Sequence, residues 1–308
     1  MYLKNNYLRS DFMGSKESFY LYATALHPAV TGSCIPVYAF KKNRLLDCFL
    51  CDCGIFQERN YEELNYEDFP FDSEKIHFVV ITHNHADHVG RLPLLYKYGF
   101  KGLIYATDST CKLLKISLEN TKKIMVEDAK RSGEKPLYDE DDVDMVLENL
   151  VPCQIDKTIQ VSEYIKMTFI DNGHINGAAM ICMQFSYPGE EDTNLLCTGD
   201  YKPTNMFKQV RPIPQWVYEL PMNVIIESTY GDTESSEIEH NFEDDVQKIL
   251  KDGQSLFIPV LAQGRAQEVL YTLKMMQDAG KISKSIPIYL DGNLAHQYTR
   301  IYASGELE

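Results

Sequence analysis

Short runs of apolar, mostly β-branched residues recur along the first 230 positions and predict strands. Some of them lack a polar residue at every second position, which is typical of strands buried on both faces. Helical patterns lie between them, notably 109–126 and the acidic 139–150, so the pattern predicts layered α/β structure. The clearest strand candidates are HFVVIT (77–82), GLIYAT (102–107), YIKMTFI (164–170), NLLCT (194–198) and NVIIES (223–228).

After Gly231 the pattern changes to a regular alternation of helices and strands. We predict helices near 237–251 and at 264–276, strands at 255–260 and 286–290, and a further helix after them. No internal repeat, low-complexity segment or flexible linker separates the two halves. Because the pattern changes after Gly231, we predict two domains, residues 1–232 and residues 233–308.

The composition narrows the class of protein. With 44% hydrophobic residues among 308, the chain can bury a sizeable core. The formal net charge of −15 disfavours general attraction to a polyanion. The acidic residues are concentrated at 61–74 and 138–144, however, so a local basic patch elsewhere on the surface is compatible with this charge. No apolar run approaches the roughly 18 residues that span a bilayer, and no signal-peptide pattern is present, so we expect a cytoplasmic protein.

The eight cysteines are scattered through apolar stretches and are not spaced as a disulfide framework, which favours a reducing compartment. Cys51 and Cys53 flank Asp52 as a C-x-C pair. We expect both cysteines to point to the same face of a strand and to pack as small hydrophobes, in preference to binding a soft metal.

The densest polar cluster is THNHADHVG at 82–90, which contains His83, His85, Asp87 and His88. On a helix the first two histidines would lie on nearly opposite sides, so we expect a loop at the carboxyl end of strand 77–82, where α/β proteins place their sites. Imidazole and carboxylate donors suit zinc or another borderline divalent ion, and the lack of a well-placed thiolate favours an open catalytic site over a closed structural one. Four such groups in so short a stretch disfavour the alternative, histidines that only stabilise a loop by hydrogen bonds.

Two further strand ends offer donors, His174 in DNGHINGAA and Asp200 in LLCTGDY. Either alone would indicate no more than a turn or a helix cap. In this order behind the histidine cluster, and together with Asp52 in LCDCGIFQ, they resemble the ordered motifs of the metallo-β-lactamase superfamily. The resemblance covers most of residues 20–232 and implies an αββα sandwich with a two-metal site at one edge.

By that resemblance the site residues have distinct roles. Asp52 would orient the histidine loop, a task that metal sites generally assign to a carboxylate. Two ions about 3.5–4 Å apart can clamp the attacking and leaving oxygens and lower the pKa of a shared water to about 7. The first zinc would be held by His83, His85 and His174 and the second by Asp87 and His88, with Asp200 bridging both.

The second half of the chain resembles the β-CASP branch of the superfamily, nucleases in which an α/β domain caps the metal site. Glu227 matches the acidic motif of that branch, where a carboxylate positions the histidine that protonates the leaving oxygen. Glutamate at this point is typical of members that act on RNA, whereas DNA-repair members tend to have aspartate. Arg265 and Gln267 open a predicted helix and either contact phosphate or support the helix. The matching segments of the second half are IIESTYGD (225–232), IPVLAQGRAQEVLY (258–271) and IPIYLDG (286–292). In the first half, TGSC (31–34) and CGIFQ (53–57) also resemble bacterial members of that branch.

We therefore predict a zinc-dependent β-CASP ribonuclease, an exonuclease or an endonuclease, that cleaves RNA phosphodiesters with metal-activated hydroxide. DNA is a less favoured substrate, no membrane partner is expected, and a homodimer is compatible with the sequence. Two alternatives stay open: a small-molecule hydrolase such as a thioesterase or lactonase, and an inactive nuclease-like scaffold. Full members continue with an FSGHA-like motif and a final histidine for the second zinc, and this sequence contains neither. We thus expect a C-terminally truncated chain with a partial cap domain and an incomplete second metal position.

Overall fold

The computed structural model describes residues 19–27, 29–133, 136–229, 231, 241–251 and 253–307. The chain divides into two compact units. The first unit contains the residues up to Asn205 together with Gln209–Glu227, and the second contains Met206–Lys208 together with Ser228–Leu307. The predicted domain boundary at residue 232 lies outside the described residues.

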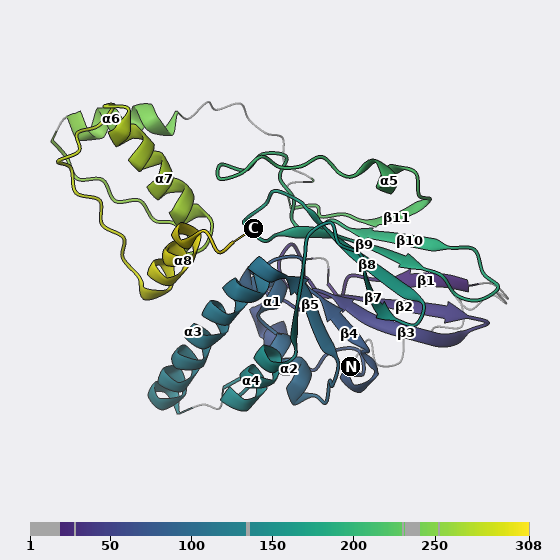
Figure 1. Cartoon of the computed structure of the whole chain (residues 1–308). Helices are drawn as coiled ribbons and strands as arrows, with labels where there is room; N and C mark the ends of the chain where they lie inside the picture. The colour runs from purple at the N-terminus through teal and green to yellow at the C-terminus, as the bar shows by residue number, and fades with distance from the viewer. Residues whose placement is uncertain are drawn as a thin grey trace. The chain divides into compact units, whose positions relative to one another are not determined.

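The strands of the first unit form two sheets (Figure 1). The first sheet consists of β1 (Phe19–Ala23), β2 (Ile35–Lys41), β3 (Arg44–Cys51), β4 (Phe78–Val80), β5 (Leu103–Thr107) and β6 (Leu150–Cys153), in this order. The second consists of β7 (Ile159–Ser162), β8 (Ile165–Asp171), β9 (Ala179–Phe185), β10 (Thr193–Cys197) and β11 (Met222–Ile225), also as neighbours in chain order. Pairing is antiparallel from β1 to β3 and from β7 to β10, and parallel from β3 to β6 and between β10 and β11.

Helices cover the outer faces of both sheets in Figure 1. On the first sheet lie α1 (Ala86–Val89), α2 (Leu92–Lys97), α3 (Asp108–Ser132) and α4 (Glu140–Glu148), and on the second lies the short α5 (Gln215–Tyr218). Two 3₁₀ turns, η1 (Glu62–Tyr66) and η2 (Ser73–Lys75), lie between β3 and β4. The layers are therefore helix, sheet, sheet and helix, and the predicted αββα sandwich is confirmed.

The apolar pattern of the sequence explains this layering. Between the sheets, Phe49 stacks on Phe78 with ring centroids 4.8 Å apart, and Phe169 and Phe185 belong to the same buried cluster. A second cluster joins the outer face of the first sheet to the leucines of α2 and α3. All five strands and both helices that the pattern predicts in the first 230 residues are present. Only three residues of the run 77–82 form a strand, because the chain leaves the sheet at the end of the run and bends toward the histidine cluster.

In the described part of the second unit the helices are α6 (Phe242–Lys251), α7 (Arg265–Asp278) and α8 (Asn293–Ser304). Val246, Leu273 and Met276 form its small core with Ile282. No helix in the described ranges has both the length and the apolarity to cross a membrane.

The strands predicted at 255–260 and 286–290 are wrong for the described residues, where neither segment belongs to a sheet. Leu256 and Ile258 pack against the helical core, whereas Phe257 between them is 87% exposed. Apolar alternation specifies a half-buried extended segment, but a strand also needs a hydrogen-bonded neighbour. The predicted α/β cap domain therefore stays a prediction.

Candidate metal centre

The histidine cluster lies just beyond the carboxyl end of β4, as the sequence predicts. His83 and His85 occupy the loop after this strand, but Asp87 and His88 lie in the single turn of α1, so the prediction that all four share a loop is wrong. One helical turn does not conflict with convergence, because the loop before it has already placed the first two rings.

Four donors from both sheets converge at this edge. The described His83, His85, His174 and Asp200 each offer one ligand atom, and these atoms lie within 4.8 Å of one another. Nδ1 of His85 is 3.0 Å from Nε2 of His83 and 3.2 Å from Nε2 of His174. His174 follows β8 and Asp200 follows β10, so the group spans the sandwich. Three imidazoles and a carboxylate fit a divalent metal ion.

A second group of donors adjoins the first through Asp200. Its Oδ2 lies 3.9 Å from Nε2 of His83 and 3.8 Å from Nε2 of His174, whereas its Oδ1 lies 3.3 Å from Nε2 of His88. The latter nitrogen is also 3.8 Å from a carboxylate oxygen of Asp87. Asp200 thus lies between the two groups, the position that the predicted bridging role requires.

Asp52 lies beneath the donors and is almost fully buried. Its Oδ2 is 2.7 Å from Nδ1 of His88, and its Oδ1 accepts a hydrogen bond of 2.8 Å from the backbone nitrogen of Thr82. The hydroxyl of Thr82 donates to the same carboxylate at 2.9 Å. With Nδ1 bonded to Asp52, Nε2 of His88 is left to face the donor group, which is the usual arrangement of a metal-ligating histidine.

The charges of the group follow from burial and from its neighbours. Burial and the adjacent imidazoles, His88 first, hold the pKa of His83 well below its usual value, so this ring is neutral and able to ligate. Burial opposes the charged form of His88, but the carboxylates of Asp52 and Asp200 outweigh it and raise the pKa well above its usual value. Burial likewise opposes ionisation of Asp200, yet the bond to His88 leaves the pKa of this carboxyl lowered. Asp200 is therefore an anion that a cation can bind.

Residues 47–156, which contain Asp52 and the histidine cluster, match the family model described as the metallo-beta-lactamase superfamily. The chain contains a metallo-β-lactamase domain. This confirms the resemblance that the motifs predict.

The names of curated relatives of the chain refer to RNA cleavage and to transcription termination. Ribonuclease TTHA0252 of Thermus thermophilus is 34% identical over 276 residues, which are 89% of this chain and 58% of that protein. Transcription termination factor FttA of Lokiarchaeum sp. is 32% identical over 242 residues, 76% of this chain and 36% of that protein. FttA of Methanosarcina mazei is 30% identical over 264 residues, which are 83% of this chain and 39% of that protein. The chain thus spans 36 to 58% of the length of these three relatives.

Two backbone segments of the first unit hold α1 in place. The nitrogen of Cys53 donates to the carbonyl of His88 at 2.7 Å, and the nitrogen of Ser33 donates to the carbonyl of Asp87 at 2.8 Å. Gly54 packs so closely that a Cβ there would lie 1.6 Å from the Asp87 oxygen. The segments TGSC and CGIFQ, which the sequence marks only as a family resemblance, therefore form the support of the second donor group.

Arg91 belongs to the same support, although the sequence pattern does not single it out. Its side chain is buried, its Nε donates to the carbonyl of Gly54 at 2.8 Å, and its guanidinium lies 5.0 Å from the ring centroids of both Phe56 and Phe69. The available signal was an arginine directly after Gly90, but an arginine is ordinarily expected at the surface. This one holds the Asp52 loop against α1.

The expectation that Cys51 and Cys53 share a face is wrong. Cys51 ends β3 and lies in the core between the sheets, 3.1 Å from Cys197, whereas Cys53 lies in the core beneath the helices. Asp52 between them has φ of 60°, which ends the strand and its alternation. Both thiols are buried. The contact with Cys197 and then burial raise the pKa of Cys51, and burial raises the pKa of Cys53, so both stay neutral and pack as small hydrophobes.

Glu227 contacts the loop that carries Asp200. Its Oε1 accepts a hydrogen bond of 2.7 Å from the backbone nitrogen of Tyr201, and its own nitrogen donates to the hydroxyl of Thr198 at 3.3 Å. The acidic motif therefore lies beside the loop of Asp200. Its predicted catalytic role stays a prediction.

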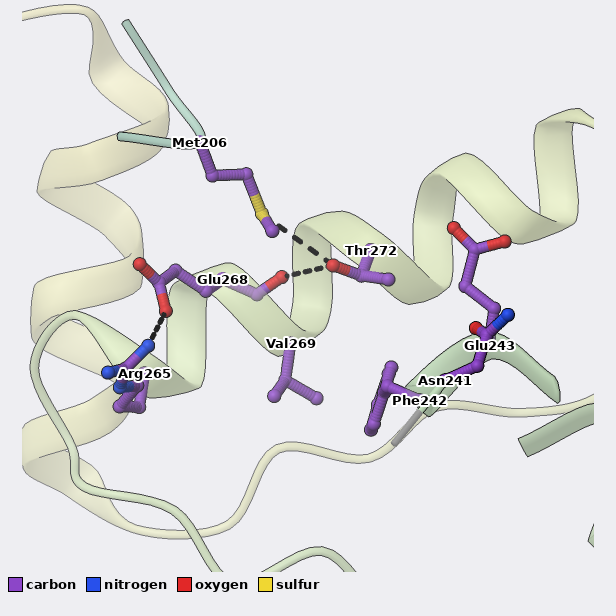
Figure 2. Close-up of a pocket in the computed structure, with 8 residues that line it drawn as sticks. All are labelled: Met206, Asn241, Phe242, Glu243, Arg265, Glu268, Val269 and Thr272. Atoms are coloured by element: carbon purple, nitrogen blue, oxygen red, sulfur yellow. Dashed lines mark hydrogen bonds and ion pairs between the residues drawn. The ribbon is translucent and has the colours of Figure 1, made fainter. Parts of the chain in front are cut away.

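The second unit contains the two predicted phosphate-binding residues. Arg265 lines a pocket of about 750 Å³ and pairs with Glu268 at 2.7 Å. Figure 2 shows this pair among the residues that line the pocket. Gln267 is buried, and its side chain bonds the nitrogen of Gly264, the carbonyl of Ala262 and the hydroxyl of Thr299. Gln267 therefore supports the start of α7, and contact with phosphate stays a prediction for Arg265.

Proposed function

We propose that this protein is a zinc-dependent ribonuclease of the β-CASP branch that cleaves RNA phosphodiester bonds. The observation that carries the proposal is the pair of donor groups that meet at Asp200. The kinship with a protein named ribonuclease supports the substrate class. Nitrogen-rich donors of borderline softness favour zinc over magnesium or calcium, which prefer oxygen.

The residues of the chain would act in three ways. His83, His85 and His174 would hold one ion, Asp87 and His88 a second, and Asp200 would contact both. Ions held there would activate a water and stabilise the charge that develops on the phosphate oxygens.

Asp52 keeps Nε2 of His88 directed at the site, and the buried backbone bonds around Gly54 keep α1 from moving. Glu227 bonds the loop after Asp200 and would orient a proton donor for the leaving oxygen. Burial of all eight cysteines as free thiols supports a reducing compartment, and we place the protein in the cytoplasm.

The test is a comparison of substrates on zinc-loaded protein. Labelled single-stranded RNA, DNA of the same sequence and a generic thioester would be offered side by side, with His83→Ala as the negative control. The proposal predicts cleavage of RNA in preference to DNA, lost on chelation and in the variant. Thioester hydrolysis without RNA cleavage would favour a small-molecule hydrolase, and no turnover of any substrate by protein that binds zinc would favour an inactive scaffold.

A further inference from the structure

One buried amide joins the two donor-bearing loops of the second sheet. The side chain of Asn172 is 2% exposed. Its Oδ1 accepts a hydrogen bond of 3.1 Å from the backbone nitrogen of His174. Its Nδ2 donates to the carbonyls of Thr198 at 3.1 Å and of Asp200 at 2.8 Å. The acceptor thus serves one donor loop and the two amide hydrogens serve the other.

The backbone holds the two loops together at the same place. The nitrogen of Lys202 donates to the carbonyl of Asn172 at 2.9 Å. Gly173, with φ of 75°, lies so close that a Cβ there would be 2.2 Å from the carbonyl oxygen of Lys202. The two loops are therefore in contact through their main chains, and the Asn172 side-chain amide fixes the position of one loop relative to the other.

Asp52 does not perform this task. Its bonds go to Thr82, His88 and, at 3.5 Å, Ser33, all of which belong to segments that follow strands of the first sheet or precede them. Each half of the donor set thus has its own buried polar anchor, a carboxylate for the histidine cluster and an amide for His174 and Asp200.

We propose that Asn172 is the positioning residue that fixes His174 relative to Asp200 and thereby sets the metal affinity of the centre. The inference rests on the proposed function only in so far as the centre binds a metal. Only an amide offers one acceptor and two donors in this place. Aspartate would direct a carboxylate oxygen at two carbonyls, and alanine would leave those carbonyls and the His174 nitrogen without their side-chain partner.

The test compares Asn172→Asp and Asn172→Ala with the wild-type chain. Zinc dissociation constants would be measured by competition with a chelator, and the visible spectrum would be recorded after loading with Co²⁺. We expect both variants to bind zinc about 10- to 100-fold more weakly. We also expect a changed cobalt spectrum, because His174 and Asp200 no longer hold one geometry.

Asn194→Ala is the matched control. Asn194 is equally buried in β10 of the same sheet, and its Nδ2 donates to the carbonyl of Pro221 at 3.2 Å, away from the donor loops. The control should lower the unfolding temperature in chelator as Asn172→Ala does, but should leave the zinc constant and the cobalt spectrum unchanged.

Two results would overturn the inference. One is wild-type zinc affinity and an unaltered cobalt spectrum in both Asn172 variants, and the other is an equal loss of affinity in Asn194→Ala, which would indicate general loosening of the sheet. Failure of the ribonuclease proposal is a separate result. The zinc-loaded wild-type chain would then leave RNA intact, while the ratio of the zinc dissociation constants of the Asn172 variants and the wild type would be unaffected.

Discussion

Nδ1 of His88 lies 2.7 Å from Oδ2 of Asp52, and this buried pair decides which nitrogen of the ring faces the donor group. Asp52 is able to do so because β3 ends at Cys51 and the backbone turns at φ of 60°. The carboxylate is thereby directed beneath α1 and not into either core.

Asp52→Asn should weaken zinc binding by about 10- to 100-fold, because the ring of His88 loses its charged partner. The measurement is chelator competition. Asp47→Asn is a matched control, since Asp47 lies within β3, five residues before Asp52, and pairs at 2.9 Å with His77, a histidine outside both donor groups. Equal zinc constants for Asp52→Asn and the wild type would contradict the assigned role.

Gly54→Ala should destabilise the fold by about 3 kcal/mol or more, because its new Cβ cannot fit beside the carbonyl of Asp87 without moving α1. Thermal unfolding of the metal-free protein measures this. Gly189→Ala is the comparison, because a Cβ at Gly189 meets nothing within 4 Å and only its φ of 78° is unfavourable. If the two variants unfold at the same temperature, the packing of Gly54 is not as tight as described.

Arg91→Lys should be nearly as harmful as Arg91→Met, because an ammonium cannot both lie between two rings and keep the Nε bond to Gly54. The expected loss is about 1–3 kcal/mol in the free energy of unfolding. Arg211→Met breaks the exposed pair with Asp156 and should cost less than about 1 kcal/mol. A fully stable Arg91→Lys variant would show that charge alone is needed.

Glu227→Gln should separate binding from turnover. The amide oxygen still accepts from the nitrogen of Tyr201, so zinc affinity should stay at the wild-type value, whereas RNA cleavage should fall about 100-fold or more if the carboxylate supports proton transfer. Single-turnover rates and chelator competition on the same preparation measure the two effects. Unchanged RNA cleavage by Glu227→Gln would contradict a role in proton transfer and would show that Glu227 only supports the loop.

The sequence predicts the layers and the principal donors because both are local properties. Apolar runs specify buried strands, and the ends of those strands carry His83, His174 and Asp200. The two strands predicted in the second unit fail because pairing depends on a neighbour that the apolar pattern does not describe. Arg91 and Asn172 were missed for a related reason: their roles depend on which loops meet in space, and nothing in a single segment indicates it.

The most direct test of the account is the zinc content of the purified chain, measured by elemental analysis after dialysis, for the wild type and His83→Ala. His83 is fully buried within the first donor group, so its loss removes a ligand without changing an exposed surface. We predict one tightly held zinc per wild-type chain, a second that is retained more weakly, and loss of the tight zinc in His83→Ala. A wild-type chain without zinc, or a variant that retains the tight zinc, would contradict it.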